Sequence, residues 1–255
     1  MADEIALVFY GRGDSLGNLK FFADDLVVTE LAGFKKENII IKNVERRKDF
    51  FEFLTTNSFS AKIKEFHIYS HAYGGALSIG YGDPLILNSR GLLADTKKGG
   101  KANYLSVLDN EVGSIFSDDF LRKPYIDYKA KIQSLFTKDA KIKIWGCNSG
   151  IEDWQYSDNL GSTRVYDADA PADYYYWRAI NEMNVPKLSI AQAFANYFQV
   201  KTYGATSGSS IQVKHNGAWQ SSPSFLKQTG RKFVKESDIL RLAPDKGVYN
   251  EYVPK

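Results

Sequence analysis

Short apolar runs alternate with segments of helical periodicity in the first part of this chain, and this alternation restricts the fold more than any other feature. Ile5–Tyr10, Asn38–Val44 and Ile63–Ala72 are rich in β-branched and aromatic residues and predict strands. Between them, apolar residues recur at helical spacing over Leu19–Leu31 and again over Arg47–Leu54. Strands that alternate with helices predict βαβ units, in which helices cover a mostly parallel sheet.

The rest of the chain continues this pattern, interrupted by a less regular stretch and a polar insertion. We expect strands over Ala140–Trp145 and Val200–Ala205, and helices over Tyr125–Phe136, Ala172–Met183 and Ser189–Phe198. Two further segments predict hairpins. One is Gly75–Leu87, which predicts a hairpin or two short strands, and the other surrounds Asn216-Gly217, a pair that suits a type I′ turn. Thr96–Ala102 and Asp153–Pro171 have the composition of exposed loops.

Composition and charge narrow the class of protein. The 255 residues are 44% hydrophobic and 25% charged, which is typical of a globular protein with a sizeable core. The formal net charge is only +3, and basic residues are mixed with acidic ones, so nothing indicates a nucleic-acid partner. One cysteine excludes an internal disulfide and fits a reducing compartment. The N-terminal residues lack a signal-peptide pattern and no apolar stretch is long enough to cross a bilayer, so we expect a cytoplasmic protein or one secreted by a leader-independent route.

The one cysteine, Cys147, follows the alternating apolar stretch Ala140–Trp145 and lies in a small, polar turn bounded by Gly146 and Gly150. Open α/β sheets bind ligands beyond the carboxyl ends of their strands, so a thiol in this place is a candidate nucleophile. A cysteine taken alone is more often a small buried hydrophobic residue. The sequence around Cys147 is what favours the catalytic interpretation.

A histidine follows a second strand in the same way. His71 comes at the end of the apolar run that begins at Ile63, and Gly74 and Gly75 follow it. An imidazole beside a thiol can take its proton and later deliver it to a leaving amine. The backbone N–H groups of Gly74, Gly75 and Cys147 are candidates for an oxyanion hole, because glycine allows a substrate to approach the backbone closely. If the two strands are parallel neighbours, the thiol and the imidazole lie at one edge of the sheet.

Three segments together resemble the caspase-like fold, whose members include caspases, gingipains, clostripain and their bacterial relatives. The segments are His71–Gly80, Ala140–Gly150 and Ser189–Gly208. The resemblance implies a three-layer α/β fold, with a mostly parallel sheet flanked by helices, and a Cys-His dyad formed by Cys147 and His71. Ala72 departs from the pattern, because the family usually has glycine after this histidine.

On this basis we expect a single caspase-like domain over residues 1–255, with a core at about 5–213 and a C-terminal hairpin region at 214–255. The expected activity is that of a cysteine endopeptidase acting on a protein or peptide substrate, as a bacterial effector or toxin would. Four residues are candidates for substrate binding: Arg12, Asp153, Thr206 and Ser207. Arg12 follows the first strand, where caspases have an arginine that binds an acidic substrate side chain. The acidic residues Glu152 and Asp153 would instead favour a basic one, and the sequence leaves this choice open.

Several alternatives remain. His67 falls on the same strand face as His71 and is a second candidate base. The stretch Ser70–Leu77 also resembles the turn that carries the serine of lipases, but Ala72 occupies the serine position and no helical pattern follows. A lipase-like hydrolase, its inactive descendant, and a non-catalytic caspase-like module that binds another protein are therefore the rival functions. We expect no metal or other cofactor, because the three histidines and the cysteine lack the spacing of ligands.

Overall fold

The computed structural model describes residues 4–13, 19–80, 113–117, 119–121, 123–152, 188–235 and 237–255. The strands are β1 (Glu4–Tyr10), β2 (Ile39–Asn43), β3 (Lys62–Tyr69), β4 (His71–Tyr73), β5 (Ala76–Ser78), β6 (Ser114–Phe116), β7 (Phe136–Ile144), β8 (Lys201–Ala205), β9 (Ser209–His215), β10 (Ala218–Ser221), β11 (Leu240–Pro244) and β12 (Tyr249–Tyr252). The α-helices are α1 (Lys20–Thr29), α2 (Arg47–Thr56), α5 (Tyr125–Gln133), α7 (Ile190–Phe198) and α8 (Ser222–Thr229), and the 3₁₀-helices are η1 (Lys36–Asn38) and η3 (Asp119–Leu121).

A six-stranded sheet forms the centre of the fold, in the order β2-β1-β3-β7-β8-β12. Its first five strands are parallel to their neighbours, and only β12 pairs in the antiparallel direction, along β8. Two three-stranded antiparallel sheets, β10-β9-β11 and β4-β5-β6, are attached to it. The prediction of an α/β fold with a mostly parallel sheet and a C-terminal hairpin region is therefore confirmed.

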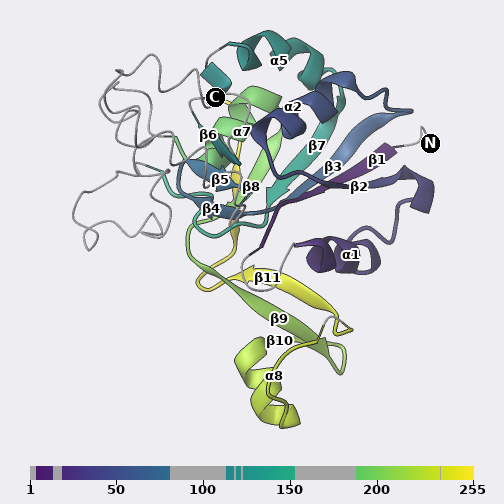
Figure 1. Ribbon diagram of the computed structural model, residues 1–255, viewed down its shortest axis with the longest axis vertical. Helices are drawn as coiled ribbons and strands as arrows, with labels where there is room; N and C mark the ends of the chain where they lie inside the picture. The colour runs from purple at the N-terminus through teal and green to yellow at the C-terminus, as the bar shows by residue number, and fades with distance from the viewer. Residues whose placement is uncertain are drawn as a thin grey trace.

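Helices cover both faces of the central sheet (Figure 1). α2, α5 and α7 pack on one face, which we call the aromatic face because its core contains Phe9, Phe50, Phe66 and many other rings. α1 and the β10-β9-β11 sheet with α8 pack on the other face. We call it the polar face because it holds the side chains of His67 and Lys143. In Figure 1 the β9, β10 and α8 elements project below the central sheet.

Burial on both faces explains the unbroken apolar run of β1. Ile5, Leu7 and Phe9 point into the core of the aromatic face, whereas Ala6 and Val8 point into the core of the polar face. A parallel strand with helices on both sides needs apolar residues at every position, because neither face meets water. β7 carries a mixed pattern instead, in which the exposed Lys141 and the partly buried Lys143 alternate with the buried Ala140, Ile142 and Ile144, because part of its polar face holds charged groups.

The C-terminal hairpin forms where the Asn-Gly pair predicts it. Asn216 and Gly217 connect β9 to β10 with φ angles of +50° and +81°, as a type I′ turn requires. β11 pairs with the other edge of β9, and β12 then returns to the central sheet. The sequence analysis did not anticipate α8, β11 or β12.

The predicted strand Ile63–Ala72 divides into two. β3 ends at Tyr69, and His71 begins β4, which belongs to a different sheet. The cause is the Gly74-Gly75 turn, which folds the chain back so that β4 pairs with β5. Gly74 has a φ angle of +58°, which suits glycine at the first loop position of a type II′ turn. The observed hairpin, His71–Ser78, thus begins before the hairpin predicted over Gly75–Leu87, and residues 81–87 of that prediction lie outside the described residues.

Other predicted elements agree with the structure or fall outside it. α7 begins at Ile190 with Ser189 as its N-cap, whose hydroxyl accepts the N–H of Gln192 at 3.1 Å. β7 begins at Phe136, earlier than the alternating pattern indicates. The predictions for Thr96–Ala102, Asp153–Pro171 and Ala172–Met183 lie outside the described residues. None of the helices in the described ranges combines the length and hydropathy needed to traverse a bilayer.

Candidate active site

Cys147 lies in a turn that begins directly after β7. Ile144 ends the strand, Trp145 is buried, and residues 146–150 form the turn. Asn148 adopts a left-handed conformation with φ +55°, which asparagine tolerates better than most residues. The thiol is partly exposed, so it is neither sealed in the core nor fully open to solvent.

The loop that follows β8 holds the cysteine turn in place. The Asn148 N–H donates to the carbonyl of Ser207, and the Gly150 N–H donates to the carbonyl of Ala205, both at 2.8 Å. The buried hydroxyl of Ser149 accepts the Ala205 N–H at 3.0 Å and donates to the Gly146 carbonyl at 3.1 Å. These hydrogen bonds, from the backbone and from the Ser149 hydroxyl, fix the turn without using the thiol.

The sulfur of Cys147 faces the start of β9. It accepts the Ser209 N–H at 3.2 Å and lies 3.9 Å from the Ser209 carbonyl oxygen. An N–H aimed at sulfur is complementary to a thiolate. Tyr249 of β12 is a neighbour: burial raises the pKa of its phenol, and the nearby Cys147 adds to this effect. No sequence signal indicated Ser209 or Tyr249, because both reach the site through β9 and β12.

The register of β3 and β7 aligns the strand ends that lead into the His71 and Cys147 segments. Ile68 pairs with Ile144 in this parallel ladder, and the next side chains, Tyr69 and Trp145, stack with ring centroids 5.3 Å apart. Cys147 comes three residues after Ile144, as His71 comes three residues after Ile68, but His71 itself lies in β4 and outside this ladder.

Close packing shows that this correspondence persists beyond the strand ends. A Cβ atom placed on Gly146 would lie 2.6 Å from the Cβ of Ala72 and 2.7 Å from the carbonyl oxygen of Ser70. The residue before Cys147 therefore touches the residues on either side of His71. On the other side of the cysteine, the Asn148 carbonyl accepts the Gly74 N–H at 3.1 Å. The His71 segment and the cysteine turn are thus joined at two points.

The N–H groups of the three candidate oxyanion donors differ in whether they already form a hydrogen bond. The Gly74 N–H is occupied by Asn148, so in this conformation it holds the cysteine turn. Within the described part of the chain, no hydrogen bond is found for the N–H of Gly75 or of Cys147. Loop N–H groups of this kind are suited to bind a carbonyl oxygen or oxyanion of a ligand.

Three of the four predicted substrate-binding residues lie within the described part of the chain, and each has a different environment. Arg12 is partly buried, and its N–H donates to the Ile79 carbonyl at 2.7 Å, which connects the end of β1 to the chain beyond β5. The Ser207 hydroxyl bonds to the Gly208 and Lys246 carbonyls, so it stabilises the loop. Thr206 borders a cavity described next. Asp153 lies outside the described residues.

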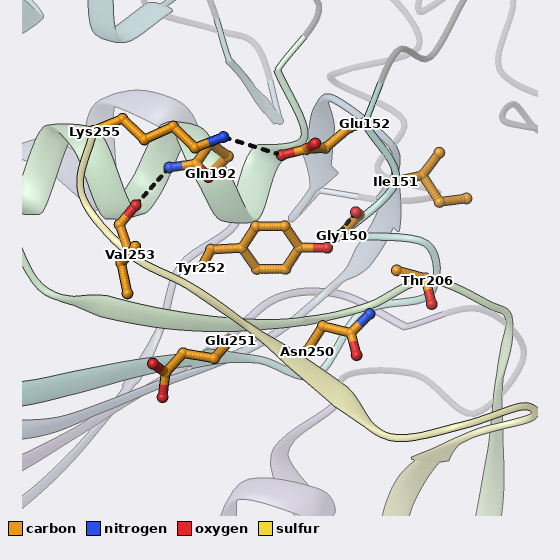
Figure 2. Close-up of a pocket in the computed structure, with 10 residues that line it drawn as sticks. All are labelled: Gly150, Ile151, Glu152, Gln192, Thr206, Asn250, Glu251, Tyr252, Val253 and Lys255. Carbon is orange, nitrogen blue, oxygen red and sulfur yellow. Dashed lines mark hydrogen bonds and ion pairs between the residues drawn. The ribbon is translucent and has the colours of Figure 1, made fainter.

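A cavity of about 720 Å³ lies beside the continuation of the cysteine turn (Figure 2). Its lining comes from the cysteine turn, α7, the β8 loop and β12: Gly150, Ile151, Glu152, Gln192, Thr206, Asn250, Glu251, Tyr252, Val253 and Lys255. Tyr252 crosses it and donates its hydroxyl to the Gly150 carbonyl. The ammonium of Lys255 is 3.8 Å from the Glu152 carboxylate, and Gln192 donates to the Val253 carbonyl at 2.8 Å. These contacts brace the end of the turn against β12.

His67, the alternative base, is buried and packed against Trp145. Its Nδ1 accepts the indole N–H of Trp145 at 3.2 Å, and its Nε2 is 3.3 Å from the Glu65 carboxylate. Burial lowers the pKa of His67, which outweighs the opposing effect of Glu65. A solvent-shielded imidazole with both nitrogens turned to neighbours is poorly placed to exchange a proton with a substrate.

The lipase-like interpretation requires a turn that leads from a strand into a helix. The chain after Ala72 instead forms the β4–β5 hairpin, and Ala72 itself is buried in that hairpin. The elbow is therefore not formed in this segment. Searching the described residues alone reveals no group of three or more His, Cys, Asp or Glu side chains arranged to hold a metal ion.

Comparison with protein-family models, with curated proteins and with solved structures finds no match to this chain. The function must therefore be argued from the site itself.

Proposed function

We propose that this protein is a cysteine endopeptidase of the caspase-like type, with Cys147 as the nucleophile and His71 as the general base. One observation carries the proposal: β3 and β7 are parallel neighbours, and the turn that holds Cys147 packs directly on the residues beside His71. The segments that follow these two adjacent parallel strands carry an imidazole and a thiol, the two groups of a dyad, at the edge where α/β sheets bind ligands.

In this mechanism His71 takes the proton of the Cys147 thiol, and the sulfur attacks the carbonyl carbon of a peptide bond. The tetrahedral intermediate collapses to a thioester as His71 gives the proton to the leaving amine. Water, activated by His71, then hydrolyses the thioester and releases the acid product. The N–H groups of Cys147 and Gly75 stabilise the oxyanion, while Gly74 positions the cysteine turn through Asn148.

The test is selective alkylation of Cys147 by iodoacetamide, followed by mass spectrometry, together with cleavage of a peptide pool. We expect His71→Ala to slow alkylation near neutral pH, because the base that removes the thiol proton is lost. Peptide cleavage should fall by about a hundredfold or more in the same variant. Cys147→Ala should abolish cleavage while changing the thermal midpoint little, because the thiol is partly exposed.

His215→Ala is the matched control, because His215 lies on β9 at the hairpin end and packs edge-on to Phe225. This variant should alkylate and cleave at the unmodified rate. Peptide cleavage that survives in Cys147→Ala, or alkylation that His71→Ala does not slow, would reject the dyad.

A non-catalytic module that binds another protein is the second candidate. The occupied Gly74 N–H and the contact of the sulfur with Ser209 favour it, because both groups are engaged within the chain. This candidate predicts an unreactive Cys147 in a correctly folded protein, whereas the peptidase predicts a reactive one.

A further inference from the structure

A second hollow, remote in sequence from the cysteine turn, lies in the C-terminal region on the polar side of the sheet. It has a volume of about 290 Å³ and is lined mostly by apolar side chains. We call it the apolar groove. Its lining comes from α1, β9, β11, α8 and the chain between α8 and β11: Phe21, Ile211, Leu226, Lys232, Phe233, Val234, Lys235 and Leu240.

The floor of the apolar groove is continuous with the core beneath it. Phe21, Ile211 and Leu226 are partly buried and pack against the core of the polar face. The floor is thus held by regular elements, and a preformed apolar hollow of this kind accepts a bulky apolar side chain without rearrangement.

One wall of the groove is unusually exposed. The Phe233 side chain is 66% accessible, although it lies beside the half-buried Val234. An aromatic ring at the edge of an apolar hollow is a common anchor of protein interfaces, because it offers a large contact area with few rotatable bonds.

The charge around the groove is positive. Lys232 and Lys235 flank Phe233 and are exposed, and neither forms an ion pair with any residue that the structure describes. From residue 209 to residue 248 the sequence contains seven Lys or Arg but three Asp or Glu, a formal charge of +4 within a chain of +3. The positive charge is therefore concentrated in this region.

Two carboxylates near the groove, those of Asp238 and Asp25, accept hydrogen bonds from groups within the protein. The Asp238 carboxylate accepts hydrogen bonds from two guanidinium nitrogens of Arg231, at 2.9 and 2.7 Å, and from the backbone N–H of Lys235, at 2.8 Å. Asp25 of α1 accepts the Leu240 N–H at 2.7 Å. Both acids therefore serve the fold. The bond from Arg231 lowers the pKa of Asp238 and the charge of Lys235 adds to this effect, while Lys232 and Lys235 both remain exposed to an external partner.

We propose that the apolar groove is a docking site for a peptide segment of another protein, one that carries a bulky apolar residue flanked by aspartate or glutamate. The hollow takes the apolar side chain, and the acidic flanks meet Lys232 and Lys235. The concave shape favours a peptide over a flat lipid surface. This inference does not depend on catalysis by Cys147.

The experiment selects binders from a displayed random-peptide library on the full-length protein and measures the affinity of the enriched peptides by fluorescence polarisation. Enriched peptides should share a large apolar residue with neighbouring acids, and they should shift the amide resonances of Ile211, Leu226 and Phe233. We expect the variant Lys232→Glu with Lys235→Glu to weaken binding by about tenfold, with a smaller effect at high salt.

A charge-matched control, Lys131→Glu with Lys138→Glu, changes two lysines exposed on α5 and β7. It should leave the affinity unchanged. Phe233→Ser should weaken binding by about tenfold as well, and because the side chain is already exposed the protein should stay folded.

Three results would overturn the proposal. These are a library that yields no peptide of this composition, enriched peptides that bind the control and the Lys232/Lys235 variant equally, and binding only to vesicles of anionic lipid. The last result would assign the surface to a membrane instead.

Discussion

The two faces of the central sheet differ in the side chains that pack on them. The aromatic face is a dense set of rings, in which Phe50 meets Phe9 at 5.2 Å and Phe194 at 6.0 Å between centroids, with the buried Arg47–Asp119 ion pair at its edge. The polar face holds His67, Lys143 and Trp145 in contact with one another. The Lys143 ammonium lies 3.6 Å from the Trp145 ring centroid and 3.6 Å from Glu30.

We infer from this difference that the aromatic face contributes mainly to stability, whereas the polar face carries the groups whose pKa values are shifted. Most rings on the aromatic face are phenylalanines, whose burial stabilises the fold through the hydrophobic effect. On the polar face, burial lowers the pKa of Lys143 in spite of Glu30, and burial raises the pKa of Tyr69. Cys147 and His71 follow Trp145 and Tyr69, so the proposed dyad lies where this polar set ends. The following predictions test that division.

The largest effect is expected from Phe50→Ala on the aromatic face. The ring is fully buried among other rings, so its removal should lower the free energy of unfolding by about 3–5 kcal/mol. Urea denaturation measures this, with Val28→Ala, at a 63% exposed site, as the neutral control. Alkylation of Cys147 in the folded variant should be unchanged. A slower alkylation would show that the two faces are not independent.

A smaller effect on stability, but a larger one on the site, is expected from Gly146→Ala. The added methyl would overlap Ala72 and the Ser70 carbonyl, so the cysteine turn and the His71 segment must separate, at a cost of about 1–3 kcal/mol. Alkylation should lose its dependence on His71. Gly33→Ala is the matched control, since nothing lies within 4 Å of its added Cβ. If Gly146→Ala alkylates and cleaves like the unmodified protein, the juxtaposition of the two segments is not what activates Cys147.

The smallest effect is a loss of stability in mild acid through His67. Burial lowers the pKa of His67 in the folded protein, so the unfolded chain binds its proton first. Stability from this group is complete above about pH 6.5, the ordinary value, and is lost as the pH falls towards the lower folded pKa. Protonation of Nδ1 would also break the bond from Trp145.

Thermal midpoints measured from neutral to acidic pH check this expectation. The downward slope below about pH 6.5 should flatten in His67→Gln and persist in His215→Gln. An unchanged slope in His67→Gln would assign the acid sensitivity to other groups.

The sequence predicted the framework of the fold because the signals were local. The apolar run of β1, the helical spacing of α2 and the Asn216-Gly217 turn each depend on nearby residues only. It also predicted that Cys147 would lie in a turn after a strand. What it missed depends on distant contacts. β4 left the β3 ladder because Gly74 allowed a tight turn, and Ser209 and Tyr249 reached the sulfur through strands with weak patterns of their own.

The brace formed by Tyr252 has a consequence for the order of events during synthesis. Its hydroxyl binds the carbonyl of Gly150, a residue made 102 positions earlier. A growing chain therefore carries the thiol, β3 and β7 long before β12 exists to close the edge of the sheet. Folding that proceeds from the N-terminus assembles the parallel strands first and secures the cysteine turn late. Translation itself then delays the moment at which the turn that carries Cys147 is fixed against β12.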